Sequence, residues 1–179
     1  MVHPFNLTIS ALAGKTHVPF VKKHLKQAAN LMKGTLRELS IVFVGDSRMS
    51  ELHGQFMDMY TPTDVLTFPI DEDARQRPVS GEVYVCIPEA RRQAKARGTQ
   101  VAHEVLLYSL HGMLHLSGFD DRTASDYRKM HRTEDRILTR LGIGRVFASV
   151  SCGATRTAVP KVPKRRLPLA APKARGVNE

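Results

Sequence analysis

Two histidines and one aspartate are spaced in this sequence so that they can hold a metal ion. His111 and His115 lie four residues apart, and at about 3.6 residues per helical turn both imidazoles fall on one face, one turn apart. Gly118 is a usual helix stop, and Asp121 follows it where the chain can fold back toward the rings. We therefore expect one Zn²⁺ per chain at His111, His115 and Asp121, with a fourth position open to water.

The segment that carries both histidines is typical of a helix that packs in the core. It runs from Thr99, which we expect to act as its N-cap, to Gly118, and it contains no proline. Its leucines require part of its surface to face the interior: Leu106, Leu107, Leu110, Leu114 and Leu116. Histidines on such a helix are either satisfied in the core or directed into a cleft, and a pair of partly exposed histidines is the alternative to a metal site.

A zinc peptidase is disfavoured by the residue that follows the first histidine. The motif H-E-x-x-H places a glutamate there as general base, and Gly112 occupies that position here. Glu104 lies seven residues before His111 on roughly the same face, but two turns away. A hydrolase that relies on a metal-activated water stays open.

Three segments also carry a resemblance to a known family. HGMLHLSGFDD at 111–121 resembles the HGxLHLxGYDH signature of the YbeY family, described as bacterial ribosomal-RNA maturation factors and single-strand-specific endoribonucleases. TPTDVLTFP at 61–69 resembles its PTDVLSFP loop, and GEVYVC at 81–86 resembles its GDIxI strand. Three further residues occupy positions where the family has its glutamate before the signature and its residues of the last helix: Glu104, Met130 and Glu134.

The resemblance covers about residues 1–145 and implies both a fold and an activity. The implied fold is a mixed sheet with the metal in a cleft beside the signature helix. The implied activity is zinc-dependent cleavage of single-stranded ribosomal RNA, with His111 and His115 as catalytic residues. RNA is then the partner, and the ribosomal subunit or its assembly factors are further candidates.

Two positions depart from the family pattern. The family's third metal ligand is a histidine where this chain has Asp121, and a carboxylate is also an acceptable zinc ligand. The family's tyrosine–arginine pair before PTDVLSFP corresponds here to Phe56 and Met57. Because such an arginine would hold phosphate and stabilise its developing charge, the alternative is a non-catalytic RNA-binding ribosome-assembly factor that kept the fold.

Three further polar residues are given structural or surface roles. Thr63 and Asp64 lie near the expected cleft, but side chains of these types commonly bond to the backbone of their own loop. His131 belongs to the last helix, and we expect it to be exposed and outside the site.

The hydrophobic pattern predicts one α+β domain of about four strands in a small sheet and about five helices, and the resemblance implies that this sheet is mixed and that the domain covers residues 1–145. The strands are expected at 5–10, 38–44, 65–68 and 81–86. The helices are expected at 17–32, 46–55, 88–97, 99–118 and 125–141.

The formal net charge of +10 is concentrated at the end of the chain. Residues 146–179 hold seven lysines or arginines, one acid and four prolines, which predicts a disordered basic tail. Such a tail is either a solubilising extension or an arm that contacts RNA phosphates, and we favour the second. Aromatic content of 6% without tryptophan argues against a stacking platform for bases.

The sequence predicts a cytoplasmic protein. It has no run of eighteen apolar residues, and its first residues lack the basic and apolar regions of a signal peptide. Cys86 and Cys152 are far apart and suggest neither a disulfide framework nor a zinc site.

Overall fold

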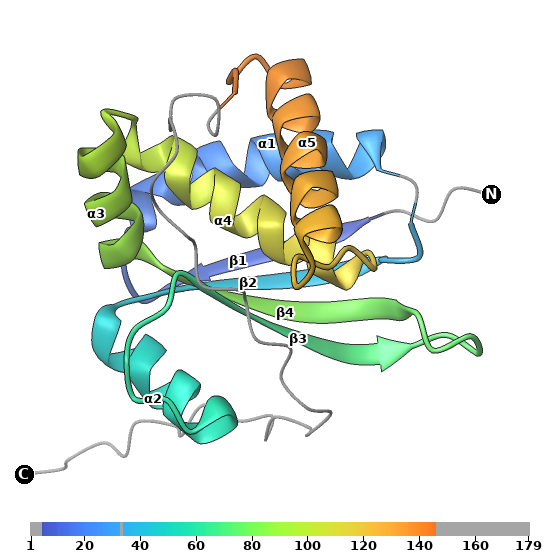
Figure 1. Cartoon of the computed structure of the whole chain (residues 1–179), viewed down its shortest axis with the longest axis horizontal. Helices are drawn as coiled ribbons and strands as arrows, with labels where there is room; N and C mark the ends of the chain where they lie inside the picture. Colours follow the sequence, from blue (N-terminus) through green and yellow to red (C-terminus); the bar gives the residue numbers. More distant parts are fainter. Residues whose placement is uncertain (1–4, 33, 146–179) are drawn as a thin grey trace, which may run out of the picture.

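A four-stranded mixed sheet lies at the centre of the computed structural model, which describes residues 5–32 and 34–145 (Figure 1). The strands are β1 (Asn6–Ala11), β2 (Glu38–Val44), β3 (Val65–Glu72) and β4 (Pro78–Cys86). Their order is β1-β2-β4-β3. β1 and β4 run parallel to β2, and β3 runs antiparallel to β4. The predicted α+β class and mixed sheet are thus confirmed.

Five α-helices cover the two faces of this sheet unequally. They are α1 (Val18–Leu31), α2 (Asp46–Met57), α3 (Ile87–Arg97), α4 (Val101–Leu116) and α5 (Ala124–Arg140), with a short 3₁₀ turn at Lys15–His17. α1, α3, α4 and α5 lie on one side of the sheet, whereas α2 lies on the other (Figure 1). None of the helices in the part of the chain that is described is long and apolar enough to cross a bilayer.

Alternating side chains of the strands belong to two separate hydrophobic cores, one on each face of the sheet. On β2, Leu39 and Ile41 belong to the large core beneath α1, α4 and α5, whereas Val44 belongs to the small core beneath α2. On β4, Val83 faces the large core and Cys86 the small one. This alternation is what a strand buried on both faces requires, because successive side chains point to opposite sides.

α4 packs closely against the sheet, and two glycines permit this close approach. A Cβ atom at Gly112 would lie 2.6 Å from a methyl carbon of Val83, and one at Gly81 would lie 2.5 Å from Leu116. Every residue of α4 from Glu104 to Leu116 is buried. The position after His111 therefore faces the sheet at contact distance, and a glutamate side chain has no space there.

The ends of α4 differ in how well the sequence predicted them. The helix begins at Val101 after Gln100, so the prediction of Thr99 as N-cap is wrong. The Thr99 hydroxyl instead donates to a carboxylate oxygen of Glu104 at 2.9 Å. The predicted stop is confirmed, because the chain turns at Gly118 with a φ of 91°, a left-handed value that favours glycine.

The β3–β4 hairpin is longer than predicted. The strand expected at 65–68 continues to Glu72, and the strand expected from Gly81 begins at Pro78. The register shifts between Pro69 and Asp71, so a bulge lets both strands continue past the proline. The hairpin closes on Asp73, whose carboxylate accepts from two backbone amides and from the Arg77 guanidinium.

Two predictions concern residues outside the described part. Cys86 is a buried free thiol, but Cys152 belongs to the segment 146–179 that is not described. The expected disordered basic tail covers the same segment and stays a prediction.

Candidate metal centre

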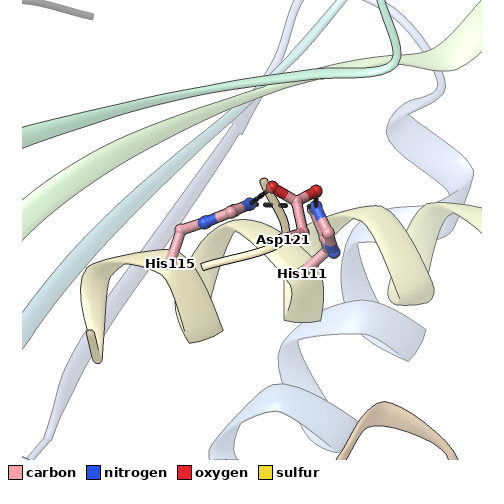
Figure 2. A group of neighbouring side chains, drawn as sticks. All are labelled: His111, His115 and Asp121. Atoms are coloured by element: carbon pink, nitrogen blue, oxygen red, sulfur yellow. Dashed lines mark hydrogen bonds and ion pairs between the residues drawn. The ribbon is translucent and has the colours of Figure 1, made fainter. Parts of the chain in front are cut away.

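The three predicted ligands meet at the C-terminal end of α4 (Figure 2). His111 and His115 project from the same face of α4, and Asp121 comes back toward them from the turn after the helix. The two Nε2 atoms are 3.0 Å apart. The carboxylate oxygens of Asp121 lie 3.6 Å from Nε2 of His111 and 3.9 Å from Nε2 of His115. The three side chains thus present one nitrogen or oxygen atom each to a common point.

The other ring nitrogens are already engaged, and this fixes which nitrogen can bind a metal. Nδ1 of His115 lies 3.1 Å from the carbonyl oxygen of Phe119, which can only accept, so Nδ1 carries the proton and donates. Nδ1 of His111 lies 2.6 Å from a carboxylate oxygen of Glu134 and donates in the same way. When the rings are neutral, both Nε2 atoms therefore carry lone pairs that face each other and the Asp121 carboxylate.

Such an arrangement of acceptors calls for a cation. The Asp121 side chain is 6% exposed, and its Oδ1 has no hydrogen-bond partner. Two facing lone pairs and a buried carboxylate repel one another unless a positive charge lies between them. Burial, together with the neighbouring His111, lowers the pKa of His115 and favours the neutral ring that binds metals. Two imidazole nitrogens and one carboxylate fit zinc's usual ligands.

Glu134 supports the centre from α5. Its side chain is fully buried, and its two oxygens accept from Nδ1 of His111 and Nδ1 of His131, each at 2.6 Å. Burial alone would raise the pKa of Glu134, but the two histidines outweigh it and hold that pKa well below its usual range. A carboxylate behind a metal-ligating histidine fixes the ring and raises its basicity.

The prediction that His131 is exposed is wrong. The residue is 8% exposed, and its ring packs edge-on against Tyr127 with centroids 3.9 Å apart. Since His131 and Glu134 are three residues apart on α5, they share the helix face that packs against α4. That spacing, next to the buried Met130, is the signal that sequence reasoning passed over.

Glu104 does not join the centre. Its side chain is fully buried at the other end of α4, where it accepts from Arg97 at 3.0 Å and from Thr99. These contacts tie the start of α4 to the end of α3. Its role is structural, as its distance of two helical turns from His111 suggested.

The loop before β3 has the structural hydrogen bonds expected of it. A carboxylate oxygen of Asp64 accepts from the backbone amide of Val65 at 2.9 Å and from the Thr63 hydroxyl at 3.2 Å. Met57 closes α2 and packs, like Phe56, against the small core. The position where the resemblance places an arginine thus holds an apolar side chain.

The fold and the centre together define an α+β domain with two helix histidines and a following carboxylate arranged to hold a metal. The family model described as "Endoribonuclease YbeY" matches residues 9–142. The chain belongs to this family.

Individual relatives agree with this assignment. The endoribonuclease YbeY of Beutenbergia cavernae is 42% identical over 115 residues, which cover 60% of this chain and 77% of that protein. The proteins of the same name from Bifidobacterium animalis subsp. lactis and Mycobacterium tuberculosis are 38% and 36% identical over 110 residues. These alignments cover 58% and 56% of this chain but only 61% and 62% of those two relatives.

A solved structure shows the same fold. The solution structure of TM1509 from Thermotoga maritima matches with a TM-score of 0.54 and 25% sequence identity. The match covers 75% of this chain and 90% of that one.

Proposed function

We propose that this protein is a zinc-dependent endoribonuclease that cuts single-stranded ribosomal RNA during ribosome maturation in the cytoplasm. The observation that carries the proposal is the convergence of three buried Lewis-basic side chains, those of His111, His115 and Asp121. The Nδ1 atoms of the two histidines are held by hydrogen bonds to the rest of the chain. The relatives named endoribonucleases support the choice of RNA as substrate.

Each residue of the centre has a defined task in this proposal. Nε2 of His111, Nε2 of His115 and the Asp121 carboxylate hold the ion. When bound in such a site, zinc acts as a Lewis acid toward phosphate oxygens and lowers the pKa of water to about 7. Glu134 keeps the Nδ1 proton on His111, and the carbonyl of Phe119 does the same for His115.

The ligand exchange from histidine to aspartate changes the charge of the centre. Asp121 brings a negative charge where the family pattern has a neutral ring, so the ion is less electrophilic than one held by three histidines. We therefore expect slower cleavage than in a variant that carries the family's histidine at this position.

The proposal is tested on the full-length protein by metal content and RNA cleavage together. We expect about one zinc per chain by elemental analysis. Zinc should be lost in Asp121→Asn and retained in Asp73→Asn, which makes the same change on the exposed hairpin turn. Cleavage of single-stranded ribosomal RNA should follow the zinc content and return when zinc is restored after chelation. A protein that takes up no zinc, or a zinc-loaded protein that leaves RNA intact, contradicts the proposal.

Met57 favours one alternative, a non-catalytic RNA-binding assembly factor. Its apolar side chain stands where the family pattern has a phosphate-binding arginine. In that case the zinc-loaded protein binds ribosomal RNA without cutting it. Met57→Arg would then introduce cleavage, whereas under the main proposal it changes only the rate of an activity already present.

A further inference from the structure

One side of α5 carries a row of four exposed arginines. Arg128, Arg132, Arg136 and Arg140 follow one another at four-residue intervals, and all four are exposed. At about 100° per residue the row drifts by roughly 40° per step, so the four side chains share one side of the helix. No ion pair joins any of them to a carboxylate within residues 5–32 and 34–145. Asp135 lies on the same side of α5, but its Oδ1 is buried and has no hydrogen-bond partner, so the four arginines have no direct ion pair in the described part of the chain.

The end of this row borders a hollow of about 340 Å³, here called the α5 hollow. It lies between the end of α1, the end of α4 and the last turns of α5, and Arg136 and Arg140 line it. Leu114 and Ile137 provide buried apolar lining, and Leu31 adds an apolar side chain that is 39% exposed. No acidic residue is among the lining residues.

The lining fits a ligand with a flat, partly apolar body and an anionic group. The volume lies at the lower end of about 300–1,000 Å³ that small-molecule sites occupy. Arginines four residues apart on a helix have Cβ atoms about 5–6 Å apart, so both guanidinium groups can reach one phosphate. A single nucleotide combines such a phosphate with a base and ribose of the right size.

The α5 hollow shares two segments with the metal centre. Phe119 lines the hollow, and its carbonyl oxygen accepts a hydrogen bond from His115. Thr133 lines the hollow, and the next residue, Glu134, holds His111. A ligand in the hollow is thus held by the same turn and the same helix that orient the two histidines.

We propose that the α5 hollow binds one nucleotide of the single-stranded RNA, with its phosphate on Arg136 and Arg140 and its base against Leu31 and Ile137. The inference rests on the proposed function, because it takes the ligand to be part of the RNA substrate. It adds an anchoring site outside the metal centre that holds the strand during cleavage. Charge complementarity and the apolar lining together favour a nucleotide over an acidic peptide, which offers no flat body for the lining.

The test measures binding of uridine and adenosine 5′-monophosphate to the zinc-loaded full-length protein by calorimetry. Arg136→Gln/Arg140→Gln should weaken binding by about tenfold or more. Arg128→Gln/Arg132→Gln removes the same charge from the same helix outside the hollow and should leave binding unchanged. Leu31→Glu, at a half-exposed edge of the hollow, should weaken binding by opposing the phosphate and the base.

Four results would overturn the inference. One is the absence of mononucleotide binding to the unaltered protein, and another is equal weakening by both arginine pairs, which indicates only general charge attraction. A third is binding that is lost in Asp121→Asn but kept in Arg136→Gln/Arg140→Gln, which places the phosphate at the metal centre. The fourth is an acidic peptide that displaces the nucleotide at lower concentration than single-stranded RNA does.

The same variants separate this inference from the proposed function. If the protein cuts RNA normally and Arg136→Gln/Arg140→Gln leaves the affinity for single-stranded RNA unchanged, the nucleotide site is wrong and the nuclease proposal stands. If the protein never cuts RNA but the hollow pair specifically loses mononucleotide and RNA binding, the nuclease proposal fails and the nucleotide site stands.

Discussion

The two ends of α4 both bury charged groups, but they treat them differently. At the N-terminal end, both oxygens of Glu104 are satisfied by Arg97 and Thr99 of the same chain. At the C-terminal end, the outer atoms of the two histidines are satisfied, while their inner nitrogens and Asp121 are left facing one another. A buried carboxylate such as that of Glu104, in which both oxygens accept hydrogen bonds from the chain, indicates a structural role. A group of buried side chains whose facing nitrogen and oxygen atoms have no partner in the chain indicates a binding site for a ligand.

Replacing Arg97, which pairs with Glu104 at the N-terminal end of α4, should have the largest effect on the stability of the protein. Arg97→Ala leaves the Glu104 carboxylate buried beside only the Thr99 hydroxyl, and a broken buried pair typically costs about 3–5 kcal/mol. Urea denaturation should show this loss in the free energy of unfolding. Zinc content of the protein that stays folded should be unchanged. A loss below about 1 kcal/mol would show that Arg97 does not neutralise this site.

Replacing Asp121 at the C-terminal end of α4 should instead increase the free energy of unfolding of the zinc-free protein. Asp121→Asn removes a buried negative charge whose Oδ1 has no partner, so the zinc-free variant should be more stable than zinc-free wild type by about 1 kcal/mol. The zinc-loaded comparison should reverse, because only the wild type gains stability from the ion. Thermal unfolding with chelator and with added zinc measures both. A variant that is less stable in both conditions would make Asp121 a structural residue like Glu104.

An intermediate effect, on the affinity for zinc, is expected from Glu134, which contacts the ligand His111. Glu134→Gln keeps the size of the side chain but removes the charge behind His111, and loss of such a partner typically weakens metal binding by about 10–100-fold. Competition with a coloured zinc chelator gives the affinity. Glu51→Gln, an exposed change on α2, serves as control and should have no effect. Equal affinities for the two variants would remove Glu134 from the centre.

The smallest effect concerns the reactivity of Cys86, which, like Glu104, is buried and hydrogen-bonded within the chain. Its thiol is buried and donates to Asp46, and burial raises its pKa to about 12. Because the folded pKa lies above the usual value of about 8.5, the neutral thiol prevails at pH 8 and should react slowly. Alkylation of a Cys152→Ser variant, which leaves Cys86 alone, measures this rate with and without urea. Rapid alkylation of the folded protein would contradict the burial of this thiol.

The sequence predicted those parts of the centre that follow from local geometry. His111, His115 and Asp121 come together because helix periodicity and a glycine turn determine their positions over eleven residues. β2 was predicted with its observed bounds, since a continuous apolar run suits a strand buried on both faces.

The remaining features depend on packing between distant segments. Glu134 lies 23 residues from His111, and only the packing of α5 against α4 brings them together. The same packing buries His131, which was expected to be exposed and outside the site. Thr99 was assigned as N-cap from its residue type, but its hydroxyl is taken by the buried Glu104, so the helix begins later. In each case a partner remote in sequence or deeply buried decided the outcome.

The tight contact between Gly112 and Val83 restricts how this protein can evolve. A Cβ atom at position 112 would come within 2.6 Å of the valine side chain, so any larger residue must displace Val83 or move α4 away from the sheet. His111 and His115 lie on the same helix as position 112 and would shift with any movement of α4. Introducing the glutamate of a zinc peptidase by a single substitution at position 112 therefore requires a rearrangement of the packing between α4 and the sheet. Packing therefore opposes a change from this centre to a zinc peptidase, although the H-E-x-x-H motif differs from this segment at one residue only.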